Sequence, residues 1–142
     1  MLDARLCFLQ QNCCIGHGDC MTFRFRSYCN ANGKCPVRDL VDKQRHQKFY
    51  PELIAGFRKL RDKKNHGNPL TEPIEDGLLE FRVDAVRILF CFRPSQLILL
   101  LHGVVKKRKK LPRTAIEQAK RNRSDYYMRR CTCDEDSVDE DF

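Results

Sequence analysis

The sequence lacks the long apolar segments that would place a chain in a membrane. No apolar run approaches the roughly 18 residues that a transmembrane helix needs, and the longest candidate, residues 97–101, is short enough to be a buried strand. The opening residues, MLDARLCFLQQ, have neither the cluster of cations nor the long apolar region of a secretory signal. We therefore expect a soluble, cytoplasmic protein with no membrane partner.

The cysteines lack the spacing of a disulfide framework or of a zinc site. There are nine of them, an odd number, and they are distributed unevenly along the chain. The segment CCIGHGDC, residues 13–20, holds cysteines and a histidine that zinc accepts as ligands, but neither a repeated CxxC pair nor a second ligand set accompanies it. We predict reduced thiols and expect neither a metal nor another cofactor.

Acidic residues are scarce outside the C-terminal end. The 142 residues include 27 Lys and Arg against 19 Asp and Glu, for a formal net charge of +8. Residues 134–142, DEDSVDEDF, hold six of those acids and no cation, so the rest of the chain has 27 cations against 13 acids, a net charge of +14. This excess favours a polyanion such as nucleic acid as the partner. The alternative is a basic surface that only keeps the protein soluble.

The first half of the chain predicts one strand and two helices. Aromatic residues alternate with arginines in MTFRFRSY, residues 21–28, which predicts a half-buried strand. After a turn at Asn32–Gly33, apolar residues recur at three- and four-residue steps, which predicts helices at about 37–46 and 50–63. Pro51 fits only the first turn of the second helix, because proline interrupts a helix interior.

The second half predicts three strands and one helix. Residues 79–83 and 86–92 alternate between apolar and polar, with a two-residue turn between them, whereas residues 97–101 are apolar throughout and predict a central strand buried on both faces. Thr114 and Glu117 form a capping-box signature for a helix that reaches about residue 128. The order β-α-α-β-β-β-α predicts an α+β fold in which helices pack on a small antiparallel sheet.

The predicted strands gather charged residues on their polar faces. Arg82 and Arg87 come near each other across the two-residue turn, and two adjacent cations repel unless an anion lies between them. A basic run, KKRKK, follows the third strand directly. Together these features predict a concave cationic surface that fits RNA phosphates. Its candidate residues are Glu80, Arg82, Arg87, His102, which ends the third strand, Lys106 and Lys107.

Such a set suffices for the cleavage of RNA without a metal ion. A base activates the 2′-hydroxyl, cations stabilise the charge that builds on the phosphorane, and an acid protonates the leaving 5′-oxygen. Glu80 or His102 is the candidate base, and His102 or a lysine is the candidate acid. The alternatives are that Glu80 only pairs with an arginine, that His102 is structural, and that the basic run is only solvated.

Five stretches follow one another in order and with short spacings: NGKCPVRDLVD, DGLLEFRV, VRILFCF, LILLLHGVVKKRKKLP and TAIEQAKRNRSDYY. Together they resemble the RelE/ParE superfamily of bacterial toxins, and within it the HigB-like, phage-derived branch. The resemblance covers about residues 21–128 and implies a RelE-like, microbial-RNase-type fold. It also implies an mRNA interferase, an endoribonuclease that arrests growth by cleaving messages while they are translated.

The resemblance also implies partners and site residues. The partners are a cognate helix-turn-helix antitoxin, mRNA and the 70S ribosome, with operator DNA bound only by the toxin–antitoxin complex. The family-type catalytic residues are the six named above, and the neighbouring RNA or ribosome contacts are Arg108, Lys109, Lys110 and Arg113. Two positions depart from the family pattern, because Phe90 stands where many relatives have Tyr and Val104 where Phe is common.

Two other functions are compatible with the same scaffold. One is a ParE-like, non-nuclease inhibitor of DNA gyrase, because function resides in the site and not in the fold. The other is a basic module that only binds nucleic acid as a repressor partner. The lack of a helix-turn-helix pattern counts against the second of these functions.

The resemblance divides the chain into three parts. We predict a Cys-rich extension outside the fold at 1–20, a toxin domain at 21–130 and an acidic, disordered tail at 131–142. The acids of the tail also suggest a segment that folds back on the cationic surface and competes with RNA.

Overall fold

The structure is a computed structural model that describes residues 22–62, 67, 70–106 and 110–129. The segments 1–20 and 131–142 lie outside the described residues, so the predictions for both ends stay predictions. The described elements are, in order, β1 (Arg24–Ser27), α2 (Pro36–Lys43), α3 (Tyr50–Leu60), β2 (Thr71–Pro73), β3 (Leu79–Val83), β4 (Val86–Arg93), β5 (Leu97–Val105) and α4 (Arg113–Arg129). Within this described part, no helix is long and apolar enough to span a bilayer.

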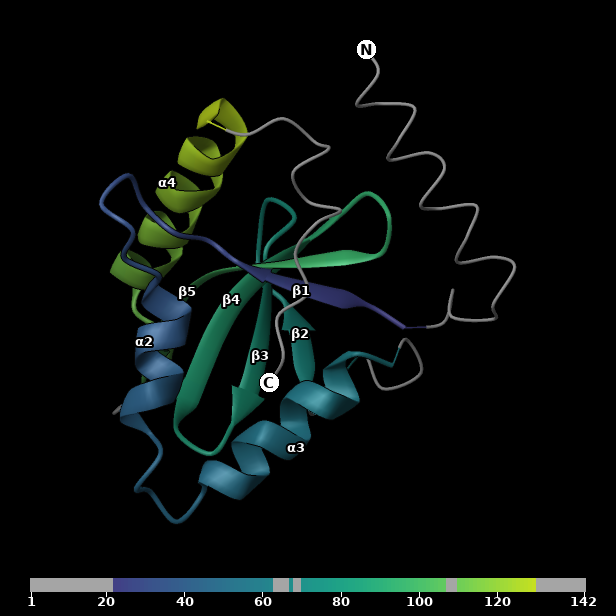
Figure 1. The fold of residues 1–142 in the computed structure, drawn as a ribbon, viewed down its shortest axis with the longest axis vertical. Helices are drawn as coiled ribbons and strands as arrows, with labels where there is room; N and C mark the ends of the chain where they lie inside the picture. The colour runs from purple at the N-terminus through teal and green to yellow at the C-terminus, as the bar shows by residue number, and fades with distance from the viewer. Residues whose placement is uncertain (1–21, 63–66, 68–69, 107–109, 130–142) are drawn as a thin grey trace.

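The strands form one five-stranded sheet in the order β1-β5-β4-β3-β2 (Figure 1). Neighbours from β2 to β5 pair antiparallel, but β1 runs parallel to β5, with Phe25 opposite Ile98. The α+β class is confirmed, whereas the prediction of an antiparallel sheet is wrong for β1. Helices α2 and α3 carry the chain from β1 to the opposite edge of the sheet, which leaves β1 beside the last strand. A local sequence pattern holds no information on so distant a partner.

The sheet separates two apolar layers. On one face, α2 and α3 bury a group of side chains that includes Phe25, Phe57, Phe81 and Phe90. On the other face, α4 buries a smaller group that includes Leu89, Leu101, Ile116 and Tyr126. In Figure 1, α4 lies at the upper left and α3 at the lower right, with the sheet between them. Lys110, which precedes α4, shares a hollow with Leu111 and Ile116 of the α4 layer and so lies next to the α4 face.

Helix α3 forms from the apolar stripe that its sequence predicts. Its fully buried side chains are Leu53, Phe57 and Leu60, which recur at three- and four-residue spacing. Pro51 lies in the first turn, as expected, where no intrahelical N–H is needed. Gly56 lets the helix approach β3 closely, because a Cβ at this position would lie only 2.7 Å from Val83 Cγ2.

Strand β5 is buried along its first five residues. Residues 97–101 are fully buried, which confirms the central strand predicted from their apolar run. The strand continues to Val105, so the prediction that His102 ends it is wrong. Pairing with β4 persists beyond the apolar run because backbone groups form the ladder, and a bulge between Leu89 and Phe90 shifts the register there.

Two local features differ from the sequence predictions. Strand β2 is a three-residue edge strand, in which Glu72 and Pro73 interrupt the apolar alternation that identifies longer strands. Helix α4 begins at Arg113, so Thr114 lies in its first turn and is not the N-cap that the capping box requires. Glu117 instead accepts a hydrogen bond from Arg113 Nε at 3.0 Å.

A disulfide joins Cys29 to Cys35 and closes the turn between β1 and α2. The expectation of reduced thiols is therefore wrong for this pair. The side-chain oxygen of Asn30 accepts hydrogen bonds from two backbone N–H groups of the turn, and Gly33 adopts a φ of 83°. These local bonds fold the chain back and bring the two cysteines together. The uneven distribution of nine cysteines could not single out this pair.

Candidate functional site

The turn between β3 and β4 brings Arg82 and Arg87 together, as predicted. The two residues are direct partners in the antiparallel ladder, and Asp84–Ala85 forms the two-residue turn between them. Cross-strand partners share a face, and Arg87 also lies opposite Val104, which packs against the α4 layer. The arginine pair, Arg82 and Arg87, therefore lies on the α4 face of the sheet.

Groups within the protein compensate this arginine pair. Arg82 Nη1 lies 2.8 Å from Glu72 Oε2, and Arg82 Nε lies 3.8 Å from Glu80 Oε1. Glu80 is buried, and Arg87 donates hydrogen bonds to two nearby backbone carbonyl oxygens. The protein's own acids therefore compensate Arg82, with Glu80 as an ion-pair partner. Arg87 has two carbonyl partners, and its buried Nε has no hydrogen-bond partner among the described residues.

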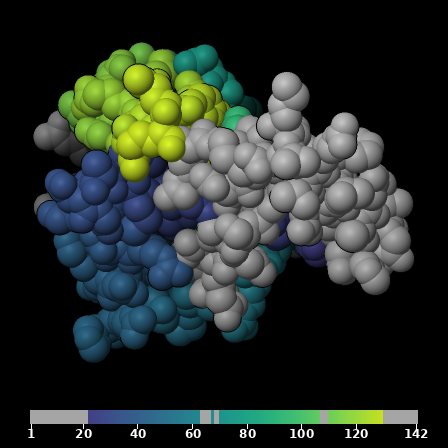
Figure 2. Space-filling view, turned by 45° about the horizontal axis from the view of Figure 1, so that its top comes forward, coloured from purple at the N-terminus to yellow at the C-terminus, as the bar shows by residue number. Residues whose placement is uncertain are grey.

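His102 lies in a polar hollow between α2, β5 and α4, here called the histidine hollow. Its volume is about 520 Å³, and its lining includes Lys34, Asp39, Lys43, His102 and Asn122. Figure 2 shows the blue surface of the α2 region adjoining the yellow-green surface of α4. His102 Nδ1 is buried and has no hydrogen-bond partner among the described residues. Burial of the imidazole lowers the pKa of His102 below its usual 6.5.

His102 should make the stability of the protein depend on pH. Its pKa is lower in the folded than in the unfolded state, so the unfolded chain binds more protons just below pH 6.5. The free energy of unfolding should therefore fall as the pH drops below about 6.5. The loss is limited because the imidazole stays partly solvated.

Urea unfolding of the wild type and of His102→Gln, at several values between about pH 5 and 8, measures this effect. The wild type should lose stability at the acid end relative to the variant. Parallel pH profiles for the two proteins would contradict the lowered pKa.

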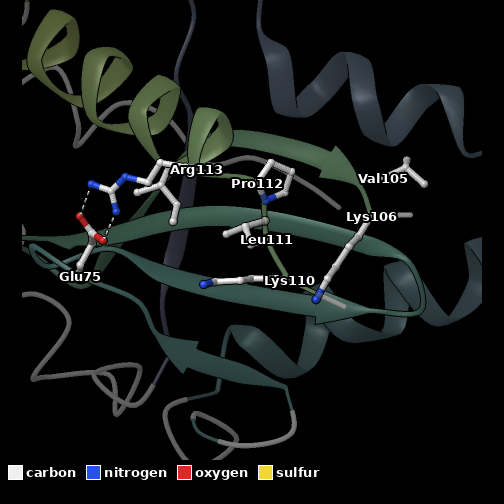
Figure 3. Close-up of a pocket in the computed structure, with 8 residues that line it drawn as sticks. Glu75, Val105, Lys106, Lys110, Leu111, Pro112 and Arg113 are labelled. Atoms are coloured by element: carbon white, nitrogen blue, oxygen red, sulfur yellow. Dashed lines mark hydrogen bonds and ion pairs between the residues drawn. The ribbon is translucent and has the colours of Figure 1, made fainter. Parts of the chain in front are cut away.

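A larger hollow, here called the cationic hollow, lies where β5 is followed by α4 (Figure 3). Its volume is about 830 Å³. Its apolar lining consists of Val105, Leu111, Pro112 and Ile116, and its charged lining of Glu75, Lys106, Lys110 and Arg113. Three of the cations predicted from the sequence therefore share one cavity. Among the residues that the structure describes, the two hollows have no lining residue in common, so the structure does not bring His102 together with Lys106.

Lys107, Arg108 and Lys109 lie outside the described residues, and their roles stay predictions. The two flanking lysines, Lys106 and Lys110, are described. Figure 3 shows both amines extending over the sheet, with the paired Arg113 and Glu75 at the other end of the hollow.

The backbone fixes the start of the basic run and adds positive potential to the cationic hollow. The N–H group of Lys106 donates to Ala85 O at 2.6 Å, which ties the start of the basic run to the turn that carries the arginine pair. Helix α4 begins at Arg113 and has no acid in its first turn. A helix N-terminus carries a partial positive charge, which these cations reinforce. The arrangement can hold an anion such as a phosphodiester beside an apolar surface.

Glu75 is a charged residue of this hollow that the sequence analysis missed. Arg113 Nη1 and Nη2 both bond to its carboxylate, the second at 3.0 Å, and Lys120 Nζ bonds to Glu75 Oε2. The hydrogen bonds from Arg113, followed by that from Lys120, lower the pKa of Glu75 to about 2. No local spacing could reveal these contacts, because the partners lie 38 and 45 residues away in the chain.

The two positions that depart from the resembled family differ in their surroundings. Phe90 is fully buried in the layer under α2 and α3, on the face opposite the arginine pair. The lack of a phenol at this position therefore removes no group from the cationic hollow. Val104 packs against the α4 layer beside Arg87, so it belongs to the same face as the site. In the described part of the chain, no three His, Cys, Asp or Glu side chains gather as metal ligands.

A family model described as "Phage derived protein Gp49-like (DUF891)" matches residues 39–124 of the chain. The match begins within α2 and ends within α4, so it includes the arginine pair and the lining residues of the cationic hollow. No curated protein matches the chain.

Proposed function

The chain belongs to the family of phage-derived Gp49-like proteins, which is associated with the toxins of toxin–antitoxin systems, and on this premise we propose that it is an mRNA-cleaving toxin. In this proposal it is a metal-independent endoribonuclease that acts on messages during translation. The observation that carries the proposal is the cationic hollow, in which Lys106, Lys110 and Arg113 surround an apolar lining.

The chemistry of the cationic hollow suits a single strand of RNA. Its described lining holds three cations and one acid, and the arginine pair lies on the same side of the sheet. Cations track the phosphates of a single strand, while its unstacked bases contact apolar or aromatic surface. The side chains of Leu111, Pro112 and Ile116 supply such an apolar surface.

The proposed reaction depends mainly on the stabilisation of charge. The 2′-oxygen gives its proton to a base and attacks the phosphorus, the bond to the 5′-oxygen breaks, and a lysine ammonium protonates that oxygen. The products carry a 2′,3′-cyclic phosphate and a 5′-hydroxyl. Lys106, Lys110 and the arginine pair stabilise the extra charge on the phosphorane.

The two candidate bases contribute differently in this proposal. Glu80 is engaged in an ion pair with Arg82, so Glu80 is a positioning residue for that arginine. His102 has the neutral imidazole that a base needs, but it lies in the histidine hollow. In this proposal water therefore takes the proton of the 2′-oxygen, and the cations supply most of the rate acceleration.

The biological setting extends the same proposal. We place the chain in the HigB-like branch of the RelE/ParE superfamily and in the cytoplasm, where translated messages occur. A cognate helix-turn-helix antitoxin neutralises it, and the 70S ribosome presents the message. The toxin–antitoxin complex, rather than the toxin alone, binds operator DNA.

The proposal is tested by mapping the 5′ ends of a translated mRNA after the full chain is added, with and without ribosomes. Treatment of the protein with a chelator, which is removed before the ribosomes are added, tests its independence from a bound metal at the same time. New 5′ ends within the coding region, formed only when ribosomes are present, are the expected result. Cuts in free RNA would show a nuclease that does not need the ribosome.

The gyrase inhibitor is distinguished in a parallel assay on supercoiled plasmid DNA. Intact messages together with gyrase-dependent breaks in the plasmid would replace the present proposal with that function. A folded protein that does neither would contradict both functions.

A further inference from the structure

The carboxylate of Glu75 occupies the centre of a group of cations on α4. It receives two hydrogen bonds from the guanidinium of Arg113 and one from the ammonium of Lys120. Arg113 is held in place from its other side by Glu117, one helical turn further along. Glu75 itself comes from the loop between β2 and β3, so a segment distant in sequence places an anion against the helix.

The ion pair of Glu75 is not the only bond that fastens this loop to α4. Arg123 Nη2 lies 2.7 Å from Asp76 Oδ2, and Arg123 Nη1 donates to Asp76 O at 2.6 Å. Within the loop, the N–H group of Leu78 donates to Glu75 O at 2.8 Å, and that of Ile74 donates to Leu78 O at 2.9 Å. The loop is therefore anchored by groups that do not line the cationic hollow, and the charge of Glu75 is free for another role.

The contacts of Glu75 have the geometry of a phosphate contact. Arginine binds carboxylates and phosphates through the same pair of parallel N–H groups, and a second cation completes the site in either case. Arg113 is also the first residue of α4, at the positive end of the helix, where an anion is stabilised and a cation alone is not. Its side chain is 59% exposed, so a ligand can reach it from the cationic hollow.

We propose that Arg113 and Lys120 form a binding site for an RNA phosphate, and that the carboxylate of Glu75 fills this site in the free protein. The inference rests on the proposed function and adds to it a residue, Lys120, and an internal competitor. RNA must displace Glu75 to reach the two cations. The sequence analysis placed such a competitor in the acidic tail, whereas the structure places an acid on the described surface of the hollow itself.

The test is the affinity of the full chain for a fluorescent single-stranded oligonucleotide made of 2′-deoxynucleotides, which binds but cannot be cleaved. Glu75→Gln should bind about three to ten times more tightly than the wild type at low salt. The slope of log affinity against log salt should stay close to that of the wild type, because the same phosphate contact forms once Glu75 is displaced. Lys120→Gln should bind more weakly than the wild type.

Asp76→Asn is the matched control, because it removes an acid of the same loop that pairs with α4 outside the hollow. Its affinity should equal that of the wild type. A gain in affinity for Asp76→Asn as large as that for Glu75→Gln would mean that the net charge of the loop, and not occupation of the site, limits binding.

Unchanged or weaker binding by a folded Glu75→Gln would overturn the inference, and thermal melting establishes folding. If Glu75→Gln did not fold, unchanged affinity of Lys120→Gln would overturn it instead. Cleavage of translated mRNA, measured in parallel, separates the two proposals. If the wild type cleaves mRNA but Glu75→Gln gains no affinity, only the inference is refuted. If the wild type neither binds RNA nor cleaves it, the proposed function is refuted.

Discussion

Replacing both Lys106 and Lys110 by Glu should abolish growth arrest and lower the rate of mRNA cleavage at least about 100-fold. The double variant converts two cations of the cationic hollow into anions, which removes the charges that would stabilise the phosphorane and repels the RNA backbone. Loss of one preorganised donor from such a site commonly costs a factor of about 100 to 1,000. Growth after induction and the rate of cleavage of a translated message are the two measurements.

The matched control for this prediction is the double variant Lys34→Glu and Lys43→Glu. It makes the same change in charge, but in the histidine hollow, whose described lining residues differ from those of the cationic hollow. It should leave growth arrest and cleavage close to the wild type. A folded Lys106→Glu, Lys110→Glu protein that is still toxic, or a control that loses toxicity instead, would contradict the location of the site.

The largest effect on stability is expected for Phe57→Ala, which should lower the free energy of unfolding by about 3–5 kcal/mol. Phe57 is fully buried between α3 and the sheet, with ring centroids 5.8 Å from Phe25 and 4.9 Å from Phe81. Truncation removes its apolar contacts and leaves a cavity. The free energy of unfolding of a small domain is only about 5–15 kcal/mol, so Phe57→Ala should remove a large part of it.

Phe92→Ala is the control for the core substitution, because Phe92 is 42% exposed and already contacts water. Phe92→Ala should lower the free energy of unfolding clearly less than Phe57→Ala does. Urea unfolding measures both variants against the wild type. Equal losses for the two substitutions would contradict the position of the core under α3.

The elements that could be predicted from the sequence are those whose pattern is local. The stripe on α3, the alternation in β3 and β4 and the apolar run of β5 each record which face of one element is buried. The two-residue turn between β3 and β4 then fixed the register that brings Arg82 opposite Arg87. Strand β2 was missed because a three-residue edge strand with a proline has too few side chains to alternate.

The pairing of β1 depends on long-range geometry that no local pattern records. Arg24 lies opposite Leu97, and the whole of the α2–α3 connection and three strands separate them in the chain. The disulfide between Cys29 and Cys35 depends instead on the exact fold of one turn. Residue counts alone do not specify that fold.

The candidate site could be predicted only in part for the same reason. The sequence placed Lys106, Lys110 and Arg113 near one another because they belong to one short segment, and the structure brings them into one hollow. His102 belongs to that segment too, but a strand continues through it and directs it into a different hollow. Glu75 comes from another part of the chain, so only the fold reveals it.

The most direct test of the central claim is 5′-end mapping of one translated mRNA on ribosomes. The wild type and the Lys106→Glu, Lys110→Glu protein are compared side by side, after both have been treated with a chelator that is then removed. Cuts within the coding region that carry a 5′-hydroxyl, made by the wild type and lost in the double variant, are the result that the account predicts. Intact message with a folded wild type, or the same cuts from both proteins, would contradict it.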